Sequence, residues 1–131
     1  MIAINDLRIG NLITDPDFPN IPSVVVEIQS DGFIVTNYND ALLNVDAIPI
    51  PLSKEVVAKI KGVRNLNINY NGGVIPLSNK TYLVVREFMG SWNIYVKSHH
   101  EKLGEYLEAN LHQLQNLYYC LTGNELEVGN I

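Results

Sequence analysis

At 131 residues, with 47% apolar and 18% charged side chains, the sequence has the size and composition of one folded globular domain and excludes a disordered chain. A single cysteine, Cys120, excludes an internal disulfide and fits a reducing compartment, and no apolar run reaches the roughly 18 residues that a membrane helix requires. Nine basic against fourteen acidic residues give a net charge of −5, whereas nucleic-acid binders usually carry a basic stripe. The sequence therefore predicts one cytoplasmic domain over 1–131, without membrane contact and with nucleic acid as an unlikely partner.

The first half of the chain has the pattern of short antiparallel strands. The segment 7–14 (LRIGNLIT) is predicted to be extended, and Gly10 within it indicates a bulge or a close backbone approach. The segment 15–22 (DPDFPNIP) is predicted to be a loop because it holds three prolines. Asp31-Gly32 lies between two β-branched runs and predicts a tight hairpin. The segment 45–51 (VDAIPIP) is predicted to be an edge strand, since its prolines cannot donate to a ladder.

A short helix is predicted to begin after Ser53. The Ser53 hydroxyl can accept a hydrogen bond from the free N–H groups of the first turn. Leu52 and Val57 have the spacing of a hydrophobic staple, and Gly62 is typical of the residue that ends a helix.

Further strands are predicted beyond this helix. Residues 66–70 (LNINY) alternate strictly between apolar and polar side chains, and two more apolar runs follow at 81–88 (TYLVVREF) and 92–97 (WNIYVK). In 98–109 (SHHEKLGEYLEA), Gly104 argues against a helix because it costs about 1 kcal/mol relative to Ala. We therefore expect a turn followed by an extended leg near Tyr106.

The C-terminal segment HQLQNLYYCLTGNELEV has the strongest helical pattern of the chain. A helix capped by Asn110 and ended by Gly123 would place five apolar side chains on one side, namely Leu111, Leu114, Leu117, Tyr118 and Leu121. Residues 125–128 alternate and are predicted to add a short strand or to lie along the sheet. The order of elements predicts an α+β fold: an antiparallel, β-rich, small barrel-like or curved sheet with a short middle helix and a C-terminal helix packed on it.

The opposite side of the C-terminal helix is unusual. His112, Asn116 and Tyr119 are spaced i, i+4 and i+7, where a solvent-facing helix usually carries Lys and Glu. Either these side chains bond to a neighbouring loop or a second subunit, or they simply face water, or they form a recognition face for a partner. A second candidate face is the only loose group of basic residues, which consists of Lys54, Lys59, Lys61 and Arg64. A solvated helix surface is the simpler interpretation of this group.

The sequence favours no catalytic, cofactor or metal site. His112 and Cys120 are separated by eight residues, or about 12 Å of helix rise, so they cannot pair as base and nucleophile. Cys120, at the flank of the leucine stripe, is predicted to be a buried hydrophobe. His99, His100 and Glu101 are adjacent and would point in different directions, and no metal-binding or phosphate-binding motif is present.

The string HQLQNLYYCLTGNELEV resembles a carboxyl-terminal signature, roughly H-x-L-Q-N-L-Y-F-A-L-T-G-x-E-L, of small uncharacterised proteins from Bacteroidota and their phages and prophages. LRIGNLI and IPIPLSKEVVAKIKG resemble two further stretches of that group, so about a third of the chain is covered. The chain departs from the signature at Tyr119-Cys120, where Phe-Ala is usual. The resemblance implies a bacterial or prophage origin and one compact domain, and it implies no activity.

Together these observations predict a non-catalytic protein–protein interaction domain rather than an enzyme. It would bind an unknown protein partner or a second copy of itself through the face formed by His112, Asn116 and Tyr119. The first alternative is a nucleic-acid accessory module that uses the four basic residues of the second candidate face. The other alternative is a small metal-dependent or hydrolytic enzyme.

Overall fold

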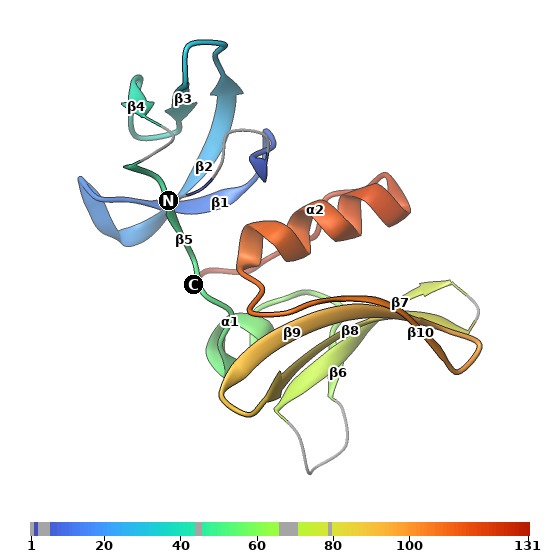
Figure 1. The fold of residues 1–131 in the computed structure, drawn as a ribbon. Coiled ribbons are helices and arrows are strands. Elements are labelled where there is room, and N and C mark those ends of the chain that lie inside the picture. The colour runs from blue at the N-terminus through green and yellow to red at the C-terminus, as the bar shows by residue number, and fades with distance from the viewer. Residues whose placement is uncertain (1, 3–5, 44–45, 66–70, 79) are drawn as a thin grey trace.

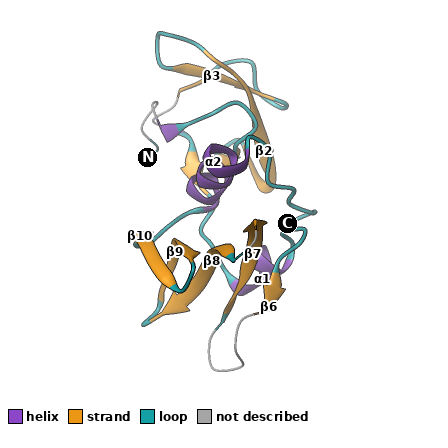
Figure 2. Cartoon of the chain, turned by 90° about the vertical axis from the view of Figure 1, so that its right-hand side faces the viewer, coloured by secondary structure: helices purple, strands orange, loops and turns teal. Residues whose placement is uncertain are grey.

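The computed structural model describes residues 2, 6–43, 46–65, 71–78 and 80–131. Within them the chain forms two five-stranded antiparallel sheets and two helices, and the C-terminal helix α2 lies between the sheets (Figures 1 and 2). The antiparallel α+β fold is therefore confirmed. The strands do not close into a small barrel, because each sheet ends in a strand that pairs on one side only.

The first sheet is built from the N-terminal half in the order β4-β3-β2-β1-β5, and Ile13, Val25 and Ile34 form the centre of its apolar cluster. The predicted hairpin is confirmed: Gly32 has φ +91°, and the Asp31 carboxylate accepts a hydrogen bond from the Phe33 N–H. The edge strand predicted near the prolines is also present as β5. The strands are β1 (Leu12–Asp15), β2 (Phe18–Ile28), β3 (Phe33–Thr36), β4 (Leu42–Leu43) and β5 (Ile48–Pro49).

The loop predicted over 15–22 is wrong except at residues 16–17, because β1 ends at Asp15 and β2 begins at Phe18. Asp15 pairs with Phe18 across a tight turn, and Ile13 pairs with Ser23, so the register shifts between these two pairs. The prolines of β2 fall inside that shift, where the ladder needs no N–H donor. Proline content alone therefore does not exclude a strand at this irregular position.

The close approach predicted at Gly10 is present. Gly10 has φ +100° and lies in a turn before β1, in which the Asn11 N–H donates to the Arg8 carbonyl at 3.0 Å. A Cβ atom at Gly10 would lie 3.1 Å from Oε1 of Glu125. The strand itself begins at Leu12, later than the extended segment predicted from residue 7.

The short helix α1 (Lys54–Ala58) begins as predicted. The Val56 N–H donates to the Ser53 hydroxyl at 3.1 Å, and both Leu52 and Val57 are buried. The tail after α2 lies against the end of this helix: Val128 forms a β-bridge with Ile60. The extended tail expected from the alternating residues is therefore held by the turn after α1 rather than by either sheet.

The second sheet has the order β10-β9-β8-β7-β6 and packs on α1 and α2. Leu83, Val85 and Ile94 are fully buried on the side that faces α2, together with Leu111 and Leu114 of the helix. The strands predicted at 81–88 and 92–97 are confirmed, whereas the one predicted at 66–70 lies outside the described residues. The strands are β6 (Arg64–Asn65), β7 (Gly72–Ser78), β8 (Thr81–Phe88), β9 (Ser91–Ser98) and β10 (Glu101–Tyr106).

The segment 98–109 forms the predicted turn and extended leg. His99 and His100 both have positive φ in the tight turn between β9 and β10. Gly104 has φ +62° at a register shift within β10, which explains how a glycine sits inside this strand.

Helix α2 (Leu111–Thr122) has the predicted ends. The Asn110 N–H donates to the Gln113 side chain at 2.8 Å, and Gly123 adopts the left-handed conformation with φ +73°. Two expectations about its sides are wrong: Leu121 is 46% exposed, and Cys120 is exposed rather than buried. The last turn of α2 therefore extends beyond the apolar cluster. No helix in the described part of the chain is long and apolar enough to cross a membrane.

Candidate functional site

The polar stripe predicted as a recognition face lies against the chain's own N-terminal segment. The Asn116 side chain accepts a hydrogen bond from Asn11 Nδ2 at 2.7 Å and donates one to the Asp6 carbonyl at 2.7 Å. The Arg8 guanidinium lies 4.2 Å from the centre of the Tyr119 ring. The structure thus brings two of the three stripe residues into one intramolecular contact.

Gln115 and Glu125 complete this contact. Gln115 is 2% exposed; its Oε1 accepts from the Leu12 N–H at 2.8 Å and its Nε2 donates to the Gly10 carbonyl at 3.3 Å. Arg8 forms a two-pronged ion pair with Glu125, with Nη2 3.0 Å from Oε2. We call these residues the polar cluster: Arg8, Asn11, Gln115, Asn116, Tyr119 and Glu125.

The polar cluster explains why this side of α2 carries amides. It faces a backbone turn whose N–H and C=O groups need partners, and an amide can both donate and accept. A lysine or glutamate there would lose hydration without matching both kinds of group. No local sequence pattern indicates this pairing, because the hydrogen-bonded residues are more than 100 positions apart.

His112, the third residue of the stripe, is buried on α2. Burial lowers the pKa of its imidazole below the usual value, and the Asp6 carboxylate opposes part of that shift. Its Nδ1 has no hydrogen-bond partner among the described residues. The native state therefore favours neutral His112.

We expect this burial to make the fold less stable in mild acid. The pKa of His112 is lower in the folded state than in the unfolded chain. The stability that neutral His112 contributes is therefore fully present above about pH 6.5, and it is lost as the pH falls toward the folded-state pKa. The free energy of unfolding, measured by urea titration from about pH 7 to about pH 5, should fall less for His112→Leu than for the wild type. His100→Leu, which alters an exposed histidine, should keep the wild-type slope. Equal slopes for wild type and His112→Leu would contradict this expectation.

The residues of the second predicted face come from α1, the turn after it and β6. Lys54 and Lys59 are exposed on and just after α1, and Lys61 pairs with Glu127 at 3.1 Å. Arg64 instead lies on β6, opposite Val74 of β7. This register places Arg64 in the second sheet, in one row with Val74 and Val84.

The side of the second sheet that points away from α2 carries a different set of residues. Leu83 and Val85 point toward α2, so Tyr82 and Val84 point outward by strand alternation, and Val84 lies opposite Tyr95. Lys97 lies opposite Tyr82, and Lys102 lies opposite Lys97. We call the following set the basic face: Arg64, Lys80, Tyr82, Arg86, Phe88, Tyr95, Lys97 and Lys102.

Charge is segregated toward the basic face. Residues 64–106 hold five of the nine basic side chains and three of the fourteen acidic ones, whereas the rest of the chain holds four basic and eleven acidic. Within the described part, Lys102 pairs with Glu105 at 2.7 Å, while neither Lys80 nor Lys97 is in an ion pair. The basic face is therefore locally cationic, although the chain as a whole has a net charge of −5.

Aromatic rings alternate with these cations. The Arg86 guanidinium lies 5.4 Å from the centre of the Tyr95 ring and 5.5 Å from that of Phe88, and the Lys102 ammonium lies 4.7 Å from Tyr95. Such contacts hold cations beside ring faces without neutralising them. Tyr82 and Phe88 remain 36% and 48% exposed, so their rings are accessible to a ligand.

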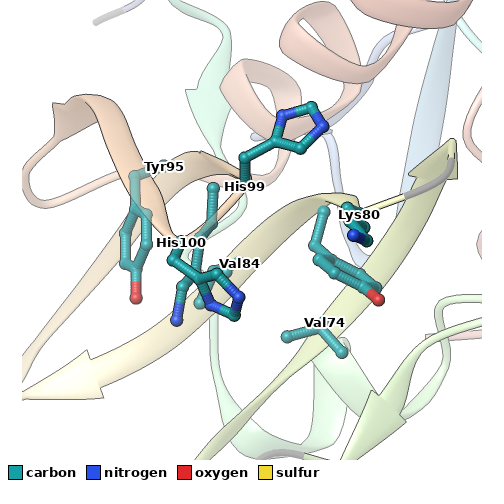
Figure 3. A pocket seen from close by; sticks show the side chains of 8 residues that line it. Val74, Lys80, Val84, Tyr95, His99 and His100 are labelled. Atoms are coloured by element: carbon teal, nitrogen blue, oxygen red, sulfur yellow. The ribbon is translucent and has the colours of Figure 1, made fainter.

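A pocket of about 420 Å³ opens at one end of the basic face. In Figure 3, His100 lies between Tyr95 and Lys80, close to Val84 and Val74. The His99 N–H donates to the Lys80 carbonyl at 3.0 Å, which ties the β9–β10 turn to the β7–β8 turn. The pocket residues are Val74, Lys80, Tyr82, Val84, Tyr95, Lys97, His99 and His100.

The other residues singled out from the sequence do not form a site. Over the described ranges, no three His, Cys, Asp or Glu side chains are grouped so that they could hold a metal ion. Cys120 lines a depression together with Asp6, Tyr106 and Gln113. Comparison of the chain with protein-family models, curated proteins and solved structures found no match.

Proposed function

We propose that the protein is a non-catalytic module that binds single-stranded nucleic acid on the basic face. The observation that carries this proposal is the alternation of exposed rings with lysines on one side of one sheet, in a chain that is acidic elsewhere. Lysines that contact phosphates release counterions and supply affinity. Exposed rings offer stacking platforms that accept any base.

A single strand fits this surface better than a duplex does. Stacking on Tyr82 or Phe88 requires bases that are free on at least one face, and a duplex keeps its bases stacked inside. Much of the basic face also lies on β8 and β9, which pair over their whole length, so the backbone that carries these rings and cations is positioned before a ligand arrives.

The proposal predicts salt-dependent binding that depends on Lys97. In fluorescence anisotropy with labelled oligo-deoxythymidine and oligo-uridine, the logarithm of the affinity should fall with that of the salt concentration by about 0.7 per phosphate contact. Lys97→Glu should weaken binding by about tenfold or more, because it reverses a charge that no carboxylate neutralises in the described part of the chain. Tyr82→Ala should weaken the free energy of oligonucleotide binding by about 1–3 kcal/mol, because it removes a ring on which a base stacks.

Lys54→Glu is the matched control, since Lys54 is exposed on α1 and outside the basic face. It makes the same change in net charge as Lys97→Glu and should leave the affinity within about a factor of two. Absence of binding at low salt, or equal losses for the two charge reversals, would argue against the basic face as the binding surface. The deoxythymidine and uridine arms separate a DNA ligand from an RNA ligand.

A protein partner is the second candidate, and the free edge of β10 favours it. β10 pairs with β9 on one side only, and three apolar side chains at and after this edge are more than half exposed: Leu103, Tyr106 and Leu107. An unpaired strand edge can add a strand from another chain, and a second copy can supply the same edge in antiparallel orientation.

Self-association through β10 predicts a concentration-dependent dimer in sedimentation velocity. Leu103→Lys should shift the protein to monomer, because a charged edge side chain disfavours strand addition. Met89→Lys is the control, since Met89 is exposed in the β8–β9 turn, away from this edge. A wild-type protein that stays monomeric at every concentration would remove this candidate.

A further inference from the structure

The floor of the pocket on the basic face is apolar and formed by three strands. Val74 lies opposite Val84, and Val84 lies opposite Tyr95, so β7, β8 and β9 each contribute one side chain to a continuous row. Val84 is only 2% exposed although it points away from the sheet's apolar cluster. Its neighbours in the row and the pocket walls therefore cover it, and the floor is already formed without a ligand.

The rim of the pocket is cationic and is held in place by backbone contacts. Tyr82 lies opposite Lys97 in the next row, and Lys80 and His100 stand in the two turns that close this end. The His99 imidazole is bonded to the Ser98 hydroxyl at 3.0 Å and lies apart from the others in Figure 3. His100, the second histidine of this turn, also lines the pocket.

These two parts select different features of one ligand. Val74, Tyr82 and Tyr95 suit a flat ring, whereas Lys80 and Lys97 suit an anionic group, and none of the described residues that line the pocket is acidic. Inorganic phosphate would leave the apolar floor unused, and an uncharged ring would leave the lysines unused. The volume of about 420 Å³ lies within the range of roughly 300–1,000 Å³ that small-molecule sites occupy.

We infer that the pocket takes one nucleotide of the bound strand. Its base lies over the half-buried Val74, beside the tyrosine rings, and its phosphate lies among Lys80, Lys97 and His100. This inference rests on the proposed function. It adds that, at one end of the basic face, one base of the bound strand enters the pocket. A strand would otherwise lie only along the exposed rings.

The first experiment is a competition against the labelled oligonucleotide. Nucleoside 5′-monophosphates should displace the strand, and inorganic phosphate or the uncharged nucleoside should each be at least about tenfold weaker, because each supplies only one of the two features. A strand that carries one 5-bromouracil should, on irradiation, cross-link to Tyr82 or Tyr95. Mass spectrometry of the digested complex identifies the modified tyrosine.

The second experiment fills the pocket. Val74→Phe places a larger side chain on the floor and should abolish displacement by nucleoside monophosphates while lowering strand affinity by about tenfold. Val26→Phe makes the same change at an exposed position of β2 in the first sheet and should alter neither. If Val74→Phe fails to fold by circular dichroism, Lys80→Met tests the rim without adding volume and should weaken monophosphate binding by a similar factor.

The outcomes separate the inference from the proposed function. Strand binding that is unaffected by monophosphates and by Val74→Phe, with cross-links only at Phe88, would overturn the pocket and leave the basic face as the binding surface. Monophosphate binding without strand binding, or no binding of either, would overturn both. Strand binding with monophosphate displacement and a tyrosine cross-link supports both.

Discussion

Replacing Gln115 with methionine is expected to lower the free energy of unfolding by about 2–6 kcal/mol. Methionine keeps the length and most of the volume of glutamine but removes its polar atoms. The Leu12 N–H and the Gly10 carbonyl would then lose their partner at a buried position of the polar cluster. A buried donor or acceptor that is left without a partner costs about 1–3 kcal/mol, so two such losses give the expected range.

Urea unfolding followed by circular dichroism measures this change. Gln29→Met is the matched control, because Gln29 is half-buried in the first sheet's hairpin and outside the polar cluster. Its effect should stay within about 0.5 kcal/mol of zero. Equal effects of the two methionine variants would show that the amide of Gln115 does not hold the first sheet to α2.

Replacing Gly72 with alanine is expected to destabilise the second sheet by about 4 kcal/mol or more. Gly72 opens β7 opposite Arg86, with φ +143°, a conformation that L-residues rarely adopt. An added Cβ would lie 2.1 Å from the Val85 carbonyl oxygen, so the backbone of β7 or β8 would have to move. β8 carries Tyr82, Arg86 and Phe88 of the basic face, so the proposed nucleic-acid binding should fall with stability.

Gly62→Ala separates the clash from the conformational strain. Gly62 also has positive φ, at +84°, but a Cβ there would meet no described atom within 4 Å. Its cost should therefore be only about 1–2 kcal/mol, measured by the same urea titration. If Gly72→Ala were no less stable than Gly62→Ala, the backbones of β7 and β8 would accommodate the added Cβ atom without a further loss of stability.

The elements that local signals specify were predictable. Ser53 and Gly123 mark the helix ends because a cap acts over three or four residues. Asp31-Gly32 marks the β2–β3 hairpin for the same reason, since a tight turn depends on the conformation of its own residues. These features needed no knowledge of the rest of the chain.

The candidate sites could not be predicted in the same way. Tyr82 and Val84 alternate with Leu83 and Val85, but β8 is apolar on both sides at its centre, so the sequence alone does not say which side is covered. Lys97 joins Tyr82 only through the strand register. The polar cluster depends on hydrogen bonds between segments that are far apart in sequence. The basic face is not evident from the net charge, because that charge is a sum over the whole chain.

The polar cluster also sets an order of events during synthesis. Arg8 and Glu125 are 117 positions apart, so at about 5–20 residues per second a ribosome needs about 6–23 s to add the second residue after the first. During that interval the turn around Asn11 has emerged without the amides of α2 that it binds in the finished protein. Until α2 leaves the ribosomal tunnel, the turn around Asn11 in the nascent first sheet therefore lacks its α2 partners. During this time the turn is open to water or to a chaperone.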